Sequence, residues 1–195
     1  MFWKRLWGKT AADLIRLYML AVYRPRKTGF RPPEGPVIYV SNHINHLDGM
    51  LLLAALRKLR PCALVARDWF EKPVYRPICE AANCLAVSRQ GLDTSWLHAV
   101  REKMAAGSSV IIFPEGHTNH GGGMDAFKPG FAMLAAMTGA PVVPVWHDRC
   151  RAFRRTELRF GGEETVGRAM TAAALGAEGE RFRGLVGALG EEKGR

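Results

Sequence analysis

Short apolar runs and longer amphipathic segments alternate along most of the chain. The runs are typical of strands in a sheet that is covered on both faces. They predict five strands, at Val37–Ser41, Ala63–Ala66, Leu85–Ser88, Val110–Phe113 and Val142–Trp146.

Between these runs the apolar residues recur with a helical period. The spacing predicts helices at Leu47–Leu59, Thr94–Ala106 and Gly130–Thr138. A glycine follows the second and the third of them, as is common at helix C-termini. The last segment, residues 163–190, predicts one or two further helices. Alternating strands and helices indicate an α/β fold, with a layered, mostly parallel or mixed sheet flanked by helices.

The first 23 residues combine aromatic, basic and aliphatic side chains at helical spacing. Trp3 and Trp7 lie among lysines and arginines, a combination typical of a helix that lies in a membrane interface. The longest uncharged apolar stretch, Leu17–Tyr23, is far shorter than the roughly 20 residues that a membrane-spanning helix needs. We therefore expect an N-terminal interfacial helical arm. The alternative is docking on the core of the domain through three apolar residues, Leu14, Leu17 and Tyr18.

Positive charge is concentrated in the same segment. The chain has a formal net charge of +10, and residues 1–35 hold eight basic and two acidic residues. Such an excess calls for a negatively charged partner, either a nucleic acid or an anionic membrane. The arm has no base-reading motif and its apolar side suits lipid, so we expect an anionic membrane surface and no nucleic acid. A non-enzymatic binding module that uses this arm is an alternative that charge alone leaves open.

Composition divides the chain into two parts. The segment Arg24–Pro36 holds four prolines and two glycines, as a linker would. We assign residues 1–35 to a basic, membrane-associating arm with its linker, and residues 36–195 to one folded domain. No small-residue cleavage site follows the arm, and the four cysteines show no paired spacing. We therefore expect a peripheral protein at the cytoplasmic side of the cell membrane, with cysteines that serve as packing residues.

The first chemical candidates follow the first predicted strand. His43 and Asp48 are five positions apart across a strand-to-helix turn, which can fold the carboxylate back onto the imidazole ring. A carboxylate on one ring nitrogen fixes the tautomer and leaves the other nitrogen free to take a proton, so the pair can serve as a general base. The spacing equally allows Asp48 to cap the following helix, with His43 as a polar loop residue.

A second group of candidates follows the later strands. Glu115 can accept hydrogen bonds from hydroxyl groups, Gly116 permits close approach of the backbone to a ligand, and Lys128 can meet an anion just before a predicted helix. Arg89 follows the third predicted strand and can hold a phosphate by a bidentate contact. The plainer interpretations are a tight turn at 114–116 and a surface ion pair for Arg89.

Four sequence blocks occur together and in one order. They are NHxxHxD at 42–48, an apolar run ending at Arg89, FPEG at 113–116 with FKPG at 127–130, and VVPV at 142–145. In this combination the chain resembles the glycerolipid acyltransferase family, whose best-known members are 1-acylglycerol-3-phosphate acyltransferases. The blocks cover about residues 37–146, and their joint occurrence is far more specific than any single block.

The resemblance implies an O-acyltransferase that moves a fatty acyl group from acyl-CoA or acyl carrier protein to the hydroxyl of a lysophospholipid, by default 1-acylglycerol-3-phosphate. His43 would remove the proton from the acceptor hydroxyl, and Asp48 would orient the ring. The hydroxyl would attack the thioester directly, without an acyl-enzyme; in agreement, no serine lies in a GxSxG elbow. No cofactor and no metal would be needed beyond the thioester co-substrate.

The resemblance also implies substrate contacts. Arg89 and Lys128 would hold the phosphate of the acceptor. Glu115 and Gly116 would shape the acceptor pocket. The segment Val142–Val145 would support the side on which the acyl chain lies.

The chain departs from the family pattern in places that concern the acceptor. Where these enzymes usually have Thr-Arg-Ser after FPEG, this chain has His117, Thr118 and Asn119, so an arginine thought to bind the phosphoglycerol head is missing. Asn83 replaces the usual Gly that begins the strand-Arg block, and Arg67 replaces a common Lys. A different lysolipid or hydroxylated lipid acceptor is therefore the alternative to 1-acylglycerol-3-phosphate.

The histidines support an alternative function from another class of enzyme, a metal-dependent hydrolase. Two HxxH pairs and two nearby aspartates contain enough ligands for a zinc or other divalent hydrolase site. These residues are His43, His46, His117, His120, Asp48 and Asp125. Polar loops produce such spacing by chance, so a metal-dependent hydrolase is kept as an alternative and no metal site is assigned.

Overall fold

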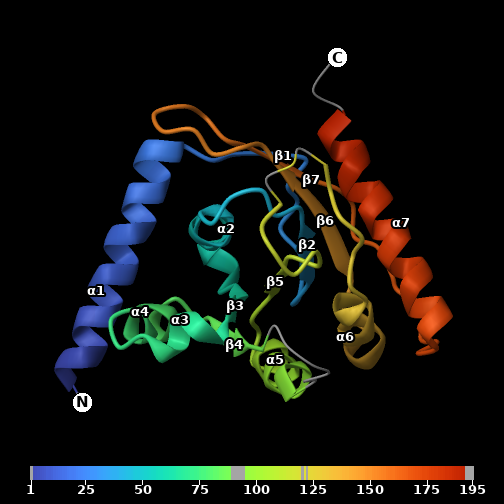
Figure 1. Ribbon diagram of the computed structural model, residues 1–195, viewed down its shortest axis with the longest axis horizontal. Helices are drawn as coiled ribbons and strands as arrows, with labels where there is room; N and C mark the ends of the chain where they lie inside the picture. The colour runs from blue at the N-terminus through green and yellow to red at the C-terminus, as the bar shows by residue number, and fades with distance from the viewer. Residues whose placement is uncertain (1, 89–94, 120, 122, 192–195) are drawn as a thin grey trace.

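The computed structural model describes residues 2–88, 95–119, 121 and 123–191, which fold around one mixed sheet (Figure 1). The strands are β1 (Arg26–Thr28), β2 (Ile38–Ser41), β3 (Cys62–Ala66), β4 (Leu85–Val87), β5 (Val110–Ile112), β6 (Val142–His147) and β7 (Glu157–Phe160). These described strands lie in the order β1-β7-β6-β2-β5-β3-β4. The five strands predicted from the apolar runs are all present, and each end lies within one residue of the expected position.

Strands β2 to β6 all run in one direction. β2 lies between β5 and β6, with Tyr39 opposite Ile111 on one side and Val143 on the other. β7 is antiparallel to β6, and β1 pairs with β7 at the edge of the sheet. The predicted α/β fold with a mostly parallel, mixed sheet is therefore confirmed.

The apolar pattern missed both strands of this edge, β1 and β7. β1 consists of three exposed polar residues inside the predicted linker, so it carries no apolar signal and exists because its backbone pairs with β7. The segment Arg24–Pro36 is thus tied to the sheet, and its interpretation as a plain linker is wrong. The division of the chain at residue 35 into arm and domain stays a prediction.

The helices match the predicted periodicity in position, with some differences in length. They are α1 (Phe2–Tyr18), a π-helical turn η1 (Met19–Tyr23), α2 (Asp48–Ala55), a 3₁₀ turn η2 (Arg57–Leu59), α3 (Arg67–Glu71), α4 (Arg76–Ala81), α5 (Ser95–Ala105), α6 (Gly130–Thr138) and α7 (Ala172–Glu191). The predicted helix at 47–59 is divided into α2 and η2. The last segment forms one long helix, α7, and the pattern missed the short α3 and α4.

The two faces of the sheet carry separate cores. On β2, Tyr39 packs in the core that includes η1 and α2, while Ile38 and Val40 pack in the core that includes α5, α6 and α7. Figure 1 shows α2 on one side of β2 and α6 and α7 on the other. This alternation of side chains along a strand whose four residues are all buried is why the run is apolar throughout. All four cysteines are free thiols, three of them buried and Cys79 partly so, as expected of packing residues.

Helix α1 lies along one side of the molecule and packs against α4 (Figure 1). The contact is close at Gly8, where a Cβ atom would lie 2.4 Å from the carbonyl oxygen of Pro77. Farther along, Met19 and Tyr23 of η1 are buried in the core that includes α2. The end of the predicted arm is therefore part of the folded domain.

The apolar side of α1 remains on the surface. Leu14, Leu17 and Tyr18 are 61%, 52% and 52% exposed, and Trp3 and Trp7 are also exposed. The alternative in which Leu14, Leu17 and Tyr18 dock on the core is therefore wrong, because Met19 and Tyr23 make that contact instead. Within the described part of the chain, no helix is both long and apolar enough to span a membrane.

Candidate active site

The carboxyl ends of β2, β5 and β6 meet at one edge of the sheet, and each is accompanied by polar side chains. His43 follows β2, Glu115 follows β5, and His147 is the last residue of β6. Because the three strands are adjacent and parallel, these residues come together although they are far apart in the sequence. This edge of an α/β sheet is the usual position of a ligand site.

The structure brings His43 and Asp48 together as the sequence predicted. Nδ1 of His43 lies 3.1 Å from Oδ2 of Asp48. The same oxygen accepts hydrogen bonds from the backbone N–H groups of Ile44 at 2.8 Å and Asn45 at 2.7 Å. Asp48 is fully buried and begins α2, but its side chain turns back to the preceding loop and does not cap the helix. The carboxylate thus closes the loop and holds the imidazole ring.

Asp48 is ionised in this environment. Burial by itself would raise its pKa, but hydrogen bonds from His147, His43 and the N–H of Asn45 outweigh burial and hold the pKa at about 2. A carboxylate can only accept a hydrogen bond, so Nδ1 of His43 carries the proton that it donates. In the neutral ring the other nitrogen of His43, Nε2, keeps its lone pair.

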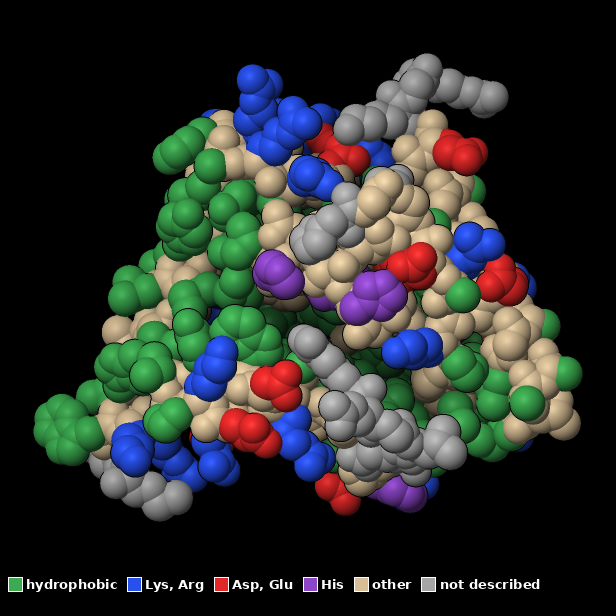
Figure 2. Space-filling model, in the orientation of Figure 1, with side chains coloured by type: hydrophobic (Ala, Val, Ile, Leu, Met, Phe, Trp, Pro, Cys, Tyr) green, Lys and Arg blue, Asp and Glu red, His purple; other side chains and the backbone are tan. Residues whose placement is uncertain are grey.

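Nε2 is the ring nitrogen of His43 that does not contact Asp48. The ring stacks on Phe113 with the ring centroids 4.3 Å apart, and the side chain is 19% exposed. The hydroxyl oxygen of Thr118 lies 3.3 Å from Nε2. Figure 2 shows histidine side chains beside a hollow on this face of the molecule. A hydroxyl group can therefore approach Nε2 from this side and transfer its proton to the ring.

A third titratable residue, His147, lies behind Asp48 and is fully buried. Its Nε2 is 2.8 Å from the carbonyl oxygen of Asn42 and 3.3 Å from Oδ2 of Asp48, and its Nδ1 is 3.2 Å from the carbonyl oxygen of Asp148. All of these oxygens only accept hydrogen bonds, so both ring nitrogens must carry protons to satisfy them. Burial by itself would lower the pKa of His147, but the Asp48 carboxylate and the two carbonyl groups raise it above its ordinary value. These contacts and the raised pKa therefore favour the protonated, imidazolium form of the buried His147.

Asn42 joins the ends of β2 and β6. Its side-chain oxygen accepts the backbone N–H of His147 at 3.0 Å, and its side-chain nitrogen donates to the carbonyl oxygen of His147 at 3.1 Å. Asn42 is fully buried. These bonds fix the position of the imidazolium relative to the loop that carries His43.

Glu115 holds the loops of the site together from inside. It is 1% exposed; Oε1 accepts the backbone N–H of His43 at 2.9 Å, and Oε2 accepts the backbone N–H of Asp125 at 3.0 Å. The side-chain nitrogen of Asn119 donates to the same Oε2 at 3.4 Å. Because its oxygens already serve protein donors, Glu115 shapes the site by fixing these loops.

Gly116 and Lys128 lie against one another although they are in different blocks. Gly116 has a φ of 76°, and a Cβ atom there would lie 2.7 Å from Nζ of Lys128. The backbone N–H of Lys128 donates to the carbonyl oxygen of Pro114 at 2.9 Å. The exposed ammonium group of Lys128 thus lies over the glycine turn, where it can meet an anion.

The remaining sequence candidates are placed as follows. Arg89 and His120 lie outside the described residues. His117 lies between the carbonyl oxygen of Glu115 and the carboxylate of Asp125, at 3.1 Å and 2.8 Å. Among the residues that the structure describes, no group of three His, Cys, Asp or Glu side chains is arranged to hold a metal ion.

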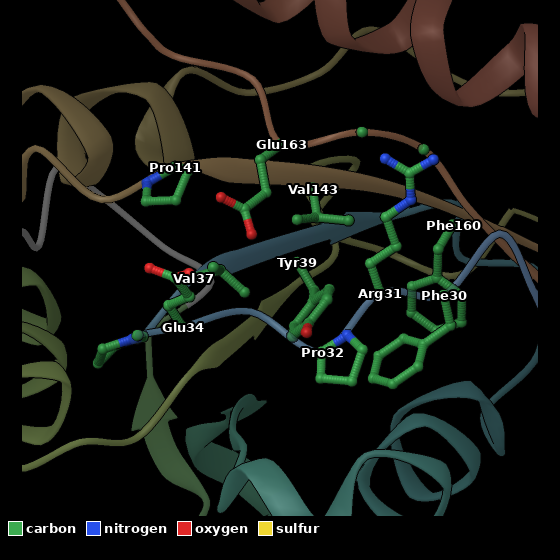
Figure 3. A pocket seen from close by; sticks show the side chains of 14 residues that line it. Phe30, Arg31, Pro32, Glu34, Val37, Tyr39, Pro141, Val143, Phe160 and Glu163 are labelled. Atoms are coloured by element: carbon green, nitrogen blue, oxygen red, sulfur yellow. The ribbon is translucent and has the colours of Figure 1, made fainter.

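A cavity of about 440 Å³ lies near the N-terminal ends of β2 and β6, opposite to the ends that carry His43 and His147 (Figure 3). Its wall includes Tyr39 of β2, Val143 of β6 and the carboxylate-bearing Glu163 (Figure 3). Val37, at its rim, is separated from His43 by about 20 Å of extended chain. Val143, expected on the acyl-chain side, therefore lines a cavity away from the His43 ring.

The sequence interpretation missed Asn42 and His147, and it assigned no position to Thr118 relative to the catalytic candidates. The available signal was the end of the apolar run at 142–146, which a histidine follows directly. Polar residues at the carboxyl ends of adjacent parallel strands converge, but the adjacency of β2 and β6 is known only from the sheet order.

Comparison with known proteins supports one family. The family model described as Acyltransferase matches residues 24–148. The chain is 31% identical over 140 residues to the 1-acyl-sn-glycerol-3-phosphate acyltransferase beta of Homo sapiens, covering 67% of this chain and 48% of that protein. It is 30% identical over 135 residues to the lyso-ornithine lipid O-acyltransferase of Pseudomonas aeruginosa, covering 68% and 50%. The chain spans half or less of the length of the curated relatives it matches.

A solved structure shares the fold. The crystal structure of the 1-acyl-sn-glycerophosphate acyltransferase PlsC from Thermotoga maritima superposes with a TM-score of 0.69 and 21% sequence identity. The match covers 96% of this chain and 82% of that one. The likeness therefore extends beyond the region of the family model to α1 and to α7.

Proposed function

The chain belongs to the acyltransferase family, and we propose that it transfers a fatty acyl group from an acyl thioester, acyl-CoA or acyl carrier protein, to the hydroxyl of a lysophospholipid. The acceptor proposed first is 1-acylglycerol-3-phosphate, which would yield phosphatidic acid. The observation that carries the proposal is the pairing of a partly exposed His43 with a buried, ionised Asp48, which contacts Nδ1 and leaves Nε2 for the substrate.

His43 acts as the general base in the proposed reaction. Its Nε2 takes the proton of the acceptor hydroxyl while the oxygen attacks the thioester carbonyl carbon. The tetrahedral intermediate then expels the thiolate, which takes the proton back from the imidazolium ring. One ester bond forms, one thioester bond breaks, and no acyl group is carried by the protein.

Asp48 orients the base and stabilises the positive charge that the His43 ring gains. The neighbouring His147 imidazolium holds the other side of the same carboxylate oxygen. Because the carboxylate also accepts two backbone N–H groups, it cannot rotate away from the ring. The geometry needed for proton transfer is therefore preorganised before substrate arrives.

The acceptor's phosphate is the proposed partner of Lys128 and Arg89. The ammonium of Lys128 lies at the turn of Gly116, and Glu115, the residue directly before this turn, accepts the backbone N–H of His43. An anionic group at this turn would therefore lie close to the reacting hydroxyl. Arg89 follows β4 and lies outside the described residues, so its part rests on its place in the sequence.

We propose that the exposed side of α1 docks on an anionic membrane at the cytoplasmic side. The lysolipid and the product are both bilayer components, so an enzyme that acts on them benefits from binding there. The side presents Trp3, Trp7, Leu14 and Leu17 to solvent beside basic residues. Aromatic and aliphatic groups flanked by cations suit the headgroup region.

A second acceptor class follows from Thr118. Its hydroxyl lies 3.3 Å from Nε2 of His43, at a position where the sequence departs from the family's arginine. With one cation fewer, the site has a weaker preference for a phosphoglycerol head. A lysolipid without a terminal phosphate is therefore the alternative acceptor, and one relative is named a lyso-ornithine lipid O-acyltransferase.

One screen tests the proposed function. The full chain is incubated with one isotopically labelled acyl thioester and a panel of lysolipids, and labelled diacyl products are identified by mass spectrometry. We expect label in phosphatidic acid, or in one other diacyl lipid if the alternative acceptor is correct. Labelled free fatty acid without any acylated lipid would contradict the proposal and support a hydrolase.

A further inference from the structure

The loop that follows β6, residues 149–155, carries four positive charges in seven residues. It contains Arg149, Arg151, Arg154 and Arg155 and no acidic residue. All four arginines are exposed. We call these residues the arginine loop.

A large apolar side chain stands in the middle of the arginine loop. Phe153 is 78% exposed, and its φ of 61° lies in the left-handed region, which bulky residues rarely adopt. Its backbone N–H donates to the carbonyl oxygen of Val22 at 2.8 Å. Phe153 therefore combines a backbone conformation that costs free energy with an aromatic ring that is left in solvent.

The arginine loop adjoins the C-terminal end of the α1 and η1 segment. Besides the bond from Phe153 to Val22, the N–H of Thr156 donates to the carbonyl oxygen of Tyr23 at 3.0 Å. Figure 1 shows the loop beside this end of the helical segment, and Figure 2 shows basic side chains gathered there next to the apolar side formed by α1. Leu17 and Tyr18, both 52% exposed, lie on the last turn of α1. The apolar groups of the helix and the loop thus belong to neighbouring parts of one surface.

We propose that the arginine loop is a second membrane-contacting element, which inserts Phe153 into the interface of an anionic bilayer and places its arginines among the headgroups. The side chains of the loop suit a lipid surface, because one aromatic ring lies among long cationic side chains. The loop has no carboxylate that would accept hydrogen bonds from a specific protein partner. The proposal rests on the membrane-bound function above and adds a contact separate from the arm.

The loop also has a structural connection to the catalytic candidates. It begins two residues after His147, and Sγ of the buried Cys150 lies 3.9 Å from Oδ1 of Asp48. A single helix lying on a membrane leaves the protein free to roll about the helix axis. A second contact beside it removes that freedom, so the site holding Asp48 keeps one orientation toward the lipid surface.

Sedimentation with lipid vesicles tests the proposal on the full chain. The vesicles contain phosphatidylcholine with or without phosphatidylglycerol. Phe153→Ser should weaken binding to the anionic vesicles about tenfold. Arg154→Gln/Arg155→Gln should also weaken it about tenfold on anionic vesicles and leave binding to neutral vesicles unchanged.

Matched controls remove the same groups elsewhere on the surface. Met170→Ser removes an exposed apolar side chain, and Arg101→Gln/Arg168→Gln removes two exposed charges. Both should bind as the unmodified chain does. Circular dichroism confirms that each variant is folded.

The outcomes separate this proposal from the docking of α1. If Trp3→Ser/Trp7→Ser lowers binding while the loop variants bind normally, the loop proposal is wrong and the arm alone docks. If the unmodified chain does not sediment with anionic vesicles, both are wrong. If Phe153→Ser changes the oligomeric state in solution and not vesicle binding, the loop contacts protein and the proposal is overturned.

Discussion

Nε2 of His147 lies 3.3 Å from the Asp48 oxygen that also lies 3.1 Å from Nδ1 of His43. One carboxylate oxygen is thus placed between two imidazole rings, one buried and one partly exposed. The backbone N–H groups of Ile44 and Asn45 reach the same oxygen. The nitrogen donors of His43, Ile44, Asn45 and His147 therefore converge on the atom that aligns the proposed base.

The pH dependence of stability should reveal the buried imidazolium. The pKa of His147 is raised in the folded protein, so its stabilising contribution is complete below the unfolded-state pKa near 6.5 and is lost as the pH rises through the folded-state value. In that window the free energy of unfolding should fall by about 1.4 kcal/mol per pH unit for this one proton. Urea unfolding at a series of pH values measures the slope, and His147→Gln should abolish this part of it.

The protonation state of His147 can be measured directly by nuclear magnetic resonance. In the protein labelled with ¹⁵N, both ring nitrogens of His147 should give the chemical shifts of a protonated imidazole at pH 7. A neutral ring at pH 7, or equal pH slopes for His147→Gln and the unmodified chain, would refute the assignment. His147→Gln should also lower kcat about tenfold, because Asp48 loses one of the groups that fix its position.

His43→Ala should abolish acyl transfer while leaving the melting temperature nearly unchanged. The ring is partly exposed and Asp48 keeps its other donors, so the fold loses little. Loss of a general base lowers the rate by about 10² to 10⁴. Transfer of a labelled acyl group measures the effect, and His98→Ala, an exposed histidine on α5, is the matched control. Turnover near that of the unmodified chain would remove His43 from the mechanism.

Asp48→Asn should reduce turnover somewhat less than His43→Ala, but it should cost stability. The substitution leaves the His147 imidazolium buried without its counter-charge, and such a loss destabilises by about 3 to 5 kcal/mol. Thermal and urea unfolding measure the effect. The double variant Asp48→Asn/His147→Gln should regain part of the stability and none of the activity. Additive losses in the double variant would show that the two residues do not interact.

Lys128→Ala should act on binding of the acceptor. If the ammonium holds the acceptor's phosphate, KM for 1-acylglycerol-3-phosphate should rise about tenfold with little change in kcat. KM for the acyl thioester should not change. Lys58→Ala, which removes an exposed lysine elsewhere, is the control. An equal rise with an acceptor that lacks the phosphate would contradict a phosphate contact.

Docking of α1 should be lost on substituting its exposed side. Trp3→Ser/Trp7→Ser/Leu14→Gln removes three exposed apolar groups from the helix and none from the core, so the fold should persist while sedimentation with anionic vesicles falls more than tenfold. Deletion of residues 1–23 is a poorer test, because it would remove the buried Met19 and Tyr23. Unchanged sedimentation of the triple variant would exclude this side of α1 as the docking surface.

The sequence by itself determined the features that depend on local pattern. Buried strands such as β2 and β6 are continuous apolar runs, so their positions followed directly from hydrophobicity. The pairing of His43 with Asp48 was one of two arrangements that the sequence allowed, because both residues lie in one short turn, and the resemblance to the family favoured it. The polar β1 had no such signal, since it is a strand only because its backbone pairs with β7.

Tertiary structure alone decided which distant residues meet. The order of strands places β6 beside β2 and so brings His147 to within reach of Asp48 across 99 positions. It also decided that Met19 is buried while Leu17 is exposed, and that Phe153 is held in solvent. These outcomes depend on sheet order and on backbone hydrogen bonds between segments. Neither the sheet order nor these hydrogen bonds produce a periodic pattern of side chains in the sequence. The backbone N–H and C=O groups that form the bonds are the same in every residue except proline, which lacks the N–H.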